Sequence, residues 1–451
     1  MTNRSTDPTR PAPGEGSARP PAAPAHADDP AARAAHPLGL TAPQAGALER
    51  FARLKVGAAF LEQGMGKSRL AVELANSRAR QLDAVLWVAP YSVLATVEEE
   101  VEKWDCRVPV RFLGYQTLSQ SDRTYLDVLQ WAKERRLMVI ADESTFIKNR
   151  TSKRHERLTE IRKSADYALV LTGTPLTRDL WDLKRQLDWL SPKIINTDDR
   201  AYRYRYFTMH KQVDGDGGER VWFETYPPNV AHLRSLMEPY IFEARLNIGV
   251  PETAREYEYG VTQETQTAYE EERDDFLAAW AEWGEEMALY RMLGNLKKIS
   301  ALDPGKCAAV AESVAGQHTI VFCQYLEEQQ QIAGHLKHHL LINGATPEAE
   351  RREIFRRSRS ESIPLLLTYG TGSFGLNLQH MSTCHFSSLP YDYGQVEQAR
   401  SRIRRLGQTR ELTYVTHLAD LGIDRLIAKN LRKKDWLARL LRREIDPTTT
   451  L

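Results

Sequence analysis

Cysteine is scarce in this chain, which has only four among its 451 residues: Cys106, Cys307, Cys323 and Cys384. Because they lie far apart and form no C-x-x-C pair, the sequence indicates neither a zinc site nor a disulfide framework, and we predict buried thiols. Long apolar runs are also missing. None approaches the roughly 18 residues that span a bilayer, and the N-terminus lacks the apolar segment of a signal peptide. We therefore expect a cytoplasmic protein with no membrane contact.

The chain also has almost no excess of charge, and its N-terminus lacks large apolar side chains. The formal net charge is +1, so nucleic acid would have to be bound by local basic surface rather than by a general attraction. Residues 1–37 contain eight prolines and ten alanines but no aromatic residue, Leu, Ile or Val. Such a segment cannot bury enough apolar surface to offset the entropy of ordering, and we predict a disordered tail.

Beyond the tail, short apolar runs alternate with longer segments of helical periodicity. In residues 38–192 the runs include "AVLWVAP", "RLMVIADE" and "YALVLTGTP", an alternation typical of a parallel sheet covered by helices. The pattern returns from about residue 316 with "HTIVFCQY" and "PLLLTYG". Between them, the turn-rich "VDGDGGERVWF" predicts a hairpin and two long runs predict helices. The predicted fold class is α/β, with one lobe at 38–192, a mostly helical connector at 193–300 and a second lobe at 301–451.

The stretch "EQGMGKS" at residues 62–68 is typical of a nucleotide-binding loop. Its glycines let backbone N–H groups close around phosphate oxygens, Lys67 is placed to reach the β- and γ-phosphates, and Ser68 can hold Mg²⁺ at a helix N-terminus. The full G-x-x-x-x-G-K-S pattern is broken, because Leu61 occupies the position of the first glycine. A structural turn is the alternative interpretation of the loop alone.

An acidic pair follows about seventy-five residues later, in "LMVIADEST". Asp142 and Glu143 come directly after an apolar strand, at the carboxyl edge where parallel sheets bind ligands. Asp142 would hold Mg²⁺, and Glu143 would orient and deprotonate the attacking water. A helix-capping role is the alternative, but the pair and the phosphate loop together favour a nucleotidase.

Two further segments complete the predicted site. "VLTGTPL" ends a strand with Thr172 and Thr174, whose hydroxyls could sense the γ-phosphate and relay its loss. "QARSRIRRLGQ" carries Arg402 and Arg405 three residues apart, which predicts one helical face and a contact with phosphate held by the other lobe. A solvated basic helix is the alternative for this second segment.

In this order, the motifs resemble those of the Swi/Snf-related ATPases, the DNA-translocating branch of superfamily 2 helicase-like proteins, and the short phage and bacterial forms most. The resemblance covers roughly residues 41–435. Beyond the segments above it rests on "APQ", "VLWVAPYSVLATVEEEVEKW", "GYQTL", "IADESTFIKN", "LTGTPLTRDLWDLKRQLDWLSP", "LMEPYIFEARLNIGVPET", "TIVFCQY", "TYGTGSFGLNLQ" and "YGQVEQARSRIRRLGQ". It implies two RecA-like lobes that close on ATP and Mg²⁺, in a bacterial or phage-infected cell.

The resemblance also implies roles for individual residues. The residues that would contact the nucleotide are Gln44, Gly64, Met65, Gly66, Lys67, Ser68, Arg69 and Gly375. The catalytic residues would be Lys67, Asp142, Glu143, Arg402 and Arg405, and the Mg²⁺ ligands would be Ser68 and Asp142. The residues that would couple ATP hydrolysis to movement are Thr172, Thr174 and Gln398, and those that would contact DNA are Ser92, Lys148, Asn149 and Thr371. The chain departs from the family at Thr145, where a histidine is usual, and at Tyr369-Gly370, where Thr-Arg is common.

Three weaker features have two interpretations each. "YRYRY" at 202–206 predicts an amphipathic edge strand, with a grip on nucleic acid as the alternative. His335 and His339 have i, i+4 spacing, which predicts a helix surface rather than a metal site. A last helix from Asp424 to Arg443 carries an apolar stripe that predicts packing on the second lobe beneath a wet basic face, with phosphate contact as the alternative; the stripe consists of Leu426, Ile427, Leu437 and Leu440.

These observations predict an ATP-dependent motor that moves along duplex DNA, or displaces what is bound there, without regard to base sequence. Two other functions stay open. One is a strand-separating helicase acting on DNA or RNA, which needs a wedge that the sequence does not reveal. The other is an ATP-gated DNA-binding subunit that recruits a nuclease, methyltransferase or replication protein.

Overall fold

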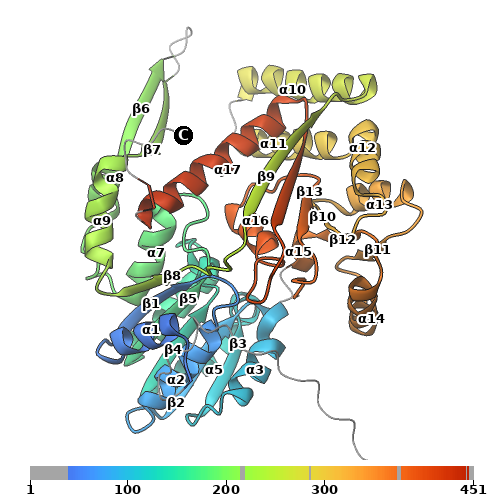
Figure 1. Ribbon diagram of the computed structural model, residues 1–451. Helices are drawn as coiled ribbons and strands as arrows, with labels where there is room; N and C mark the ends of the chain where they lie inside the picture. Colours follow the sequence, from blue (N-terminus) through green and yellow to red (C-terminus); the bar gives the residue numbers. More distant parts are fainter. Residues whose placement is uncertain (1–38, 214–218, 284–285, 373–376, 443, 446–451) are drawn as a thin grey trace, which may run out of the picture. The chain divides into compact units, whose positions relative to one another are not determined.

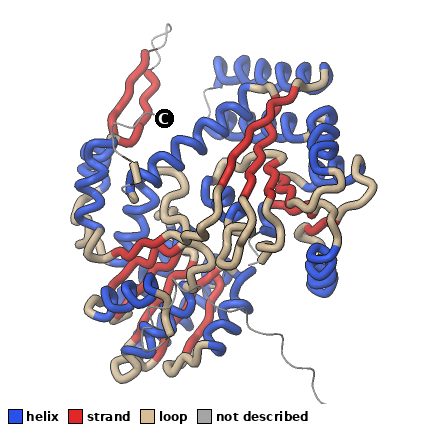
Figure 2. The backbone as a smooth tube through the Cα atoms, in the orientation of Figure 1, coloured by secondary structure: helices blue, strands red, loops and turns tan. Residues whose placement is uncertain are grey.

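A computed structural model describes residues 39–213, 219–283, 286–372, 377–442 and 444–445 (Figure 1). The tail predicted at 1–37 lies outside these residues. Two six-stranded sheets form the framework, every pair of neighbouring strands within them is parallel, and helices pack around both (Figure 2). The predicted class, two α/β lobes with a mostly helical connector, is confirmed.

The first lobe has the strand order β3-β2-β4-β5-β1-β8. All residues of β2 and β4 are buried, because helices cover both faces of a parallel sheet. The strands are β1 (Val56–Leu61), β2 (Ala84–Ala89), β3 (Val110–Gly114), β4 (Leu137–Asp142), β5 (Tyr167–Thr172) and β8 (Ile241–Ala244). The helices are α1 (Ala42–Ala52), α2 (Lys67–Ser77), α3 (Leu94–Lys103), α4 (Tyr115–Gln120), α5 (Asp122–Lys133), α6 (Lys153–Lys163), α7 (Leu180–Leu190), α8 (Asp199–Tyr206) and α9 (Val230–Met237).

The second lobe has the strand order β11-β12-β10-β13-β14-β9. Its strands are β9 (Glu252–Tyr259), β10 (Ile320–Cys323), β11 (Leu340–Ile342), β12 (Leu365–Thr368), β13 (Thr383–Phe386) and β14 (Leu412–Ala419). Its helices are α10 (Gln263–Trp283), α11 (Glu286–Ala301), α12 (Pro304–Val314), α13 (Leu326–Gly334), α14 (Glu348–Ser360), α15 (Tyr369–Gly372), α16 (Tyr393–Arg400) and α17 (Gly422–Leu441). Cys307, Cys323 and Cys384 are buried and Cys106 is half-buried, and all four are free thiols.

The connector does more than join the lobes. It supplies β8 to the edge of the first sheet and β9 to the edge of the second. It also contains the predicted hairpin, whose strands β6 (Phe207–Val213) and β7 (Glu219–Thr225) pair antiparallel and project beyond α8 (Figure 1). The two edge strands were not expected within this region, and the domain boundaries at 192 and 300 stay predictions.

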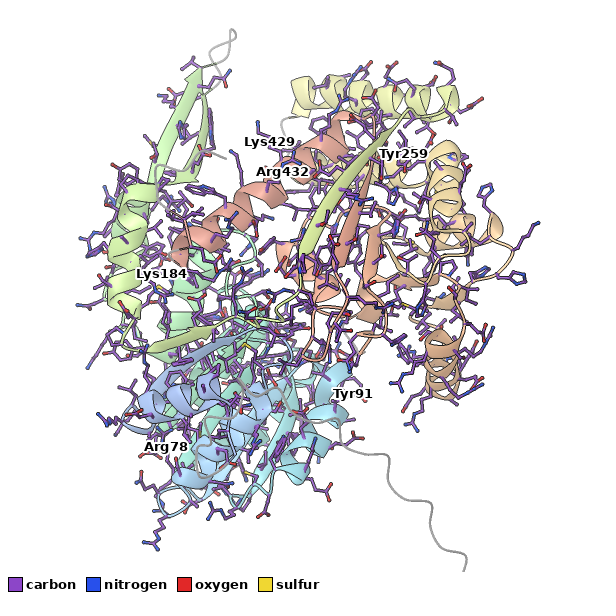
Figure 3. All side chains as sticks on the ribbon, in the orientation of Figure 1. Arg78, Tyr91, Lys184, Tyr259, Lys429 and Arg432 are labelled. Atoms are coloured by element: carbon purple, nitrogen blue, oxygen red, sulfur yellow. The ribbon has the colours of Figure 1, made fainter. Side chains whose placement is uncertain are left out.

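The last helix, α17, joins the two hydrophobic cores. Ile427 packs into the core of the second lobe, as predicted, but Leu437 and Leu440 pack into the core of the first. Leu426 is exposed rather than part of the stripe. Lys429 and Arg432 mark the outward basic face (Figure 3). The prediction that this helix packs on one lobe alone was wrong, because its C-terminal turns reach the first lobe and contact α9.

Two local predictions were also wrong. "YRYRY" belongs to helix α8 rather than to a strand, because Tyr202 and Tyr206, four residues apart, both fill the core and Asp198 caps the helix. His335 and His339 do not share a helix, since α13 ends at Gly334. Among the described residues, no cluster of three or more His, Cys, Asp or Glu side chains suits a metal ion, and no helix has the length and apolar composition that a membrane crossing requires.

Candidate active site

The phosphate loop lies between β1 and α2, the context that its sequence predicts. Gly64 and Gly66 have φ of +85° and +72°, a left-handed conformation that favours glycine. A Cβ atom on Gly66 would lie 2.2 Å from Nε2 of Gln44. The Nζ of Lys67 donates to the carbonyl of Leu61 at 3.1 Å, so the ammonium group is held beside the loop.

Gln44 contacts this loop directly, whereas Arg69 contacts an aromatic ring beyond it. The Nε2 atom of the buried Gln44 donates to the carbonyls of Met65 (3.0 Å) and Gly66 (3.2 Å). The guanidinium of Arg69, one residue beyond Ser68 on α2, lies 4.2 Å from the ring centroid of Trp104. Gln44, for which the resemblance implies a nucleotide contact, therefore holds the backbone of the loop.

The acidic pair lies at the same edge of the first sheet as the phosphate loop. Strand order places β5 between β4 and β1, so the carboxyl ends of three strands present Asp142, Thr172 and the loop at one edge. Asp142 is 7% exposed. Its Oδ2 accepts from Nε1 of Trp87 at 3.3 Å, and its Oδ1 accepts from the backbone N–H of Glu143 at 2.9 Å.

Burial, reinforced by the adjacent Glu143, raises the pKa of Asp142 to about 6, while Lys67 opposes the rise. The carboxylates of Asp142 and Glu143 lie at a buried strand end with the ammonium group of Lys67 nearby, so this site offers negatively charged oxygen ligands. Carboxylate and hydroxyl oxygens are the ligands that Mg²⁺ accepts, so Asp142 and Ser68 fit the ion that the sequence implies.

Glu143 has an unusual backbone. Its φ of +48° is left-handed, which costs energy in a residue other than glycine and turns the side chain out of the strand direction. The hydroxyl of Thr172 points at its Oε2 (3.5 Å) and accepts from the N–H of Thr174 at 3.1 Å. The two threonines of the third motif are thus linked to this carboxylate.

Arg402 comes from the second lobe and is 2% exposed. Its Nε atom has no hydrogen-bond partner among the described residues. Burial, and then the charge of Arg405, lower its pKa to about 9, and the carboxylate of Glu143 acts in the opposite direction. A buried guanidinium without a compensating contact costs several kcal/mol, so this position favours an anionic ligand.

Arg402 and Arg405 do not share a helical face, contrary to the prediction. Helix α16 ends at Arg400, and the chain continues in turns. Arg405 folds back, with its Nε donating to the carbonyl of Ser401 at 3.2 Å, and burial lowers its pKa. The turn rather than a helix presents both arginines.

Contacts between the lobes fix this turn beside the phosphate loop. The hydroxyl of Ser401 donates to Oε1 of Gln63 at 2.6 Å. Arg404 forms ion pairs with Glu62 of the first lobe and, at 2.7 Å, with Glu252 of β9. Sequence reasoning gave no role to these residues, although Glu62 and Gln63 are the first two residues of the predicted loop stretch.

Two segments of the chain match family models. Residues 101–299 match the SNF2-related domain, and residues 304–407 match the helicase conserved C-terminal domain. The chain belongs to the Swi/Snf-related, helicase-like proteins. The second match ends within the turn that carries Arg402 and Arg405, and the first includes Asp142 and Glu143.

Individual relatives agree with this family. The "DNA annealing helicase and endonuclease ZRANB3" of Mus musculus is 24% identical over 413 residues, covering 83% of this chain and 38% of the relative. The "Chromatin structure-remodeling complex subunit snf21" of Schizosaccharomyces pombe is 24% identical over 444 residues, covering 83% and 36%. The chain thus spans little more than a third of these relatives. A solved "SWI2/SNF2 ATPase core in complex with dsDNA" from Sulfolobus solfataricus is 17% identical, with coverage of 90% and 97% and a TM-score of 0.40.

In this Swi/Snf-related chain a cleft of about 1210 Å³ lies between the lobes. The residues that line it include Glu143, Thr145, Thr174, Gln398 and Arg402. Ser92, Gln116, Lys148 and Arg154 also line it. Tyr91, beside Ser92, is 70% exposed (Figure 3). One continuous cleft thus contains predicted catalytic, coupling and DNA-contacting residues.

Three of the residues predicted for DNA contact are held by bonds within the chain. The Nζ of Lys148 donates to the hydroxyl of Thr177 and forms an ion pair with Asp392 of the second lobe at 3.3 Å. Asn149 is exposed, but its Oδ1 accepts from the N–H and hydroxyl of Thr151. Thr371 is 2% exposed and its hydroxyl donates to the carbonyl of Thr368. Gly375 lies outside the described residues.

Proposed function

We propose that this chain is an ATP- and Mg²⁺-dependent motor that moves along duplex DNA, or displaces what is bound to it, independently of base sequence. The observation that carries the proposal is Arg402, a buried guanidinium of one lobe whose Nε has no hydrogen-bond partner in the described part of the chain, in a cleft with Glu143 of the other. An ATP γ-phosphate in that cleft would supply the missing anion. ATP would thereby join the two lobes.

Residues of the first lobe would bind the nucleotide and prepare the water. Lys67 and the N–H groups of the loop contact the phosphates, and Ser68 and Asp142 hold Mg²⁺, which neutralises charge on the phosphate oxygens when bound. Glu143, held in a left-handed turn beside Thr172, accepts the proton of the attacking water. Arg402 and Arg405 stabilise the charge that develops on the transferred phosphoryl group.

Hydrolysis would change how the lobes are held together. Arg402 loses its anion when phosphate leaves, while Ser401 and Arg404 connect the same turn to Gln63 and Glu62. A change at the γ-phosphate therefore acts on a segment that spans both lobes. Alternation between the two arrangements would step the protein along a DNA backbone held at the cleft mouth.

Duplex DNA as the partner is supported by two observations. The relatives are named for DNA annealing and chromatin remodelling, and Arg154 and Ser92 line the cleft and can donate hydrogen bonds to a phosphate backbone. A cytoplasmic location stays a prediction. The helicase alternative gains one observation, since the β6–β7 hairpin projects beyond α8, as a strand-separating element would have to.

A DNA-stimulated ATPase assay tests the proposal. We expect turnover to be stimulated more by blunt duplex DNA than by single-stranded DNA or RNA, and to fall steeply with salt because phosphate contacts dominate. Lys67→Ala should weaken ATP binding, whereas Glu143→Gln should retain binding and abolish turnover. Stronger stimulation by RNA or single-stranded DNA, or efficient unwinding of a fork, would favour the helicase. Equal loss of ATP affinity in both variants would overturn the assigned roles.

A further inference from the structure

Exposed apolar side chains gather in one short segment of the first lobe. Of the sixteen large hydrophobic residues described as exposed, seven lie between positions 204 and 226: Tyr204, Met209, Val213, Val221, Trp222, Phe223 and Tyr226. The rest are scattered singly, which is ordinary for a protein surface, whereas a contiguous exposed patch marks an interaction site. The exposed apolar side chains of helix α8 and the β6–β7 hairpin therefore indicate an interaction site.

Helix α8 separates its tyrosines from its arginines. Tyr202 and Tyr206 point into the core, and the hydroxyl of Tyr202 donates to the carbonyl of Leu180 at 2.8 Å. Arg200, Arg203 and Tyr204 have the spacing of the opposite face and are exposed. The guanidinium of Arg200 lies 5.9 Å from the ring of Tyr204. This face of the helix thus presents two cations and one aromatic ring to solvent, and Arg205 beside it is exposed as well.

The hairpin continues this surface. Its register pairs Met209 with Phe223 and Lys211 with Val221, so these side chains lie on one face of the ribbon. The guanidinium of Arg203 lies 4.8 Å from the ring of Phe223 and joins helix to hairpin. We call this surface the hairpin patch, defined by Arg200, Arg203, Tyr204, Met209, Val221 and Phe223.

The charges of the hairpin patch favour an anionic occupant. Over the described residues, neither Arg200 nor Arg203 forms an ion pair with a carboxylate. Asp199, next to Arg200, pairs instead with Arg185 and Arg150. The exposed side chains of Tyr204, Met209 and Phe223 favour flat apolar groups on the same ligand. Phosphates with unpaired bases meet both requirements, and aromatic stacking in a basic setting is how proteins hold single strands.

The size of the hairpin patch points the same way. Neighbouring strands lie about 4.8 Å apart, so a two-stranded ribbon offers a narrow face. A stable protein interface buries about 800 Å² on each partner, which calls for a broader surface. A single strand of nucleic acid needs only a narrow surface, because its bases bind one after another along a line.

We propose that the hairpin patch binds a single strand of nucleic acid through its phosphates and unpaired bases. This inference rests on the proposed function in one respect, that the strand comes from the DNA on which the motor acts. The patch would hold a strand freed at a fork or gap while the cleft holds the duplex. It would make branched DNA a better substrate than blunt duplex.

The test compares binding of labelled oligothymidylate with duplex-stimulated ATPase activity. In Tyr204→Ala/Phe223→Ala, affinity for oligothymidylate should fall at least about tenfold, because stacking contributes about 1–3 kcal/mol per base. The ATPase rate with blunt duplex should stay unchanged, since neither residue lines the cleft. Arg200→Gln/Arg203→Gln should also weaken binding and reduce its dependence on salt.

Leu126→Ala/Leu277→Ala is the matched control, because both leucines are exposed (60% and 55%) but lie elsewhere, and it should bind oligothymidylate as the wild type does. Thermal denaturation shows whether each variant is folded. Unchanged affinity in both patch variants would refute the proposal. So would sedimentation showing a dimeric wild type and a monomeric Tyr204→Ala/Phe223→Ala variant, which would make the patch a protein contact. Single-strand binding without any ATPase activity would refute the proposed motor alone.

Discussion

Two cations of the second lobe are equally buried but differ in their surroundings. Lys306 on α12 is 0% exposed, and its Nζ forms an ion pair with Oδ2 of Asp424 at 3.2 Å. Asp424 also accepts from the hydroxyl of Ser300 at 2.7 Å and from the N–H of Ala419 at 2.8 Å. Arg402 is 2% exposed, and within the ranges that the structure describes its Nε has no hydrogen-bond partner. The fold satisfies the charge in its core and leaves the one in the cleft unsatisfied.

The carboxylates differ in the same way. Glu328, buried in the second lobe, accepts hydrogen bonds from the hydroxyls of Ser387 (2.6 Å) and Ser388 (2.8 Å). Asp142 accepts from Nε1 of Trp87 and from the backbone N–H of Glu143, and its neighbour Glu143, which lines the cleft, is a second carboxylate. Structural charges are therefore compensated within the chain, whereas charges in the cleft favour ligands that the chain does not supply. Three predictions use this difference.

The largest effect is expected at Arg402. Arg402→Ala should lower kcat for ATP hydrolysis about 10³-fold, because the residue would act only on charge that develops during the reaction. Its free energy of unfolding should not fall, since no hydrogen bond to its Nε is lost. Steady-state kinetics and urea denaturation measure the two quantities.

Arg432→Ala is the control for Arg402→Ala. Arg432 is an exposed arginine of the same lobe whose pair with Glu256 is open to solvent, so neither kcat nor stability should change much. A normal kcat in Arg402→Ala, or a loss of stability without a change in kcat, would mean that Arg402 is structural like Lys306.

The next effect is expected at Lys306 and should appear in stability alone. Lys306→Met removes the cation and leaves Asp424 buried without it, which typically costs about 3–5 kcal/mol of unfolding free energy. Lys306→Met/Asp424→Asn should recover part of this loss, because no uncompensated charge remains. Urea denaturation checks both variants. Full stability in the single variant would contradict the contrast with Arg402.

Sequence reasoning predicted the framework and most of the cleft for physical reasons. Strand runs and helical periodicity are local, so the two lobes could be predicted. The loop at Gly64–Ser68 and the pair at Asp142–Glu143 each follow a strand, so their meeting at one sheet edge followed from parallel topology. The roles given to these residues stay predictions.

What the sequence could not provide depends on contacts between distant segments. The pairs Arg404–Glu62 and Ser401–Gln63 join positions more than 330 residues apart, and no local pattern marks them. The tyrosines and arginines of "YRYRY" alternate as in a strand, but Tyr202 and Tyr206 are both buried in the core on one side of α8. Strands β8 and β9 are short or polar, and only pairing to a sheet edge makes them strands.

The smallest effect concerns Asp142 and is a matter of pH. Its pKa is about 6 in the folded protein, against an ordinary value of 3.8, so the folded state holds this proton more tightly than the unfolded chain does. Between these two values the folded state binds more protons, and the free energy of unfolding falls as the pH rises through that window. Asp142→Asn should therefore be more stable than the wild type at pH 7 in the absence of nucleotide, by up to about 2–3 kcal/mol. The difference should vanish below about pH 4 and shrink when Mg²⁺ and ATP are added, since those ligands stabilise the charged carboxylate. Thermal denaturation across pH 4–8 measures it, and equal stability at every pH would mean that the charge of Asp142 is already compensated within the chain.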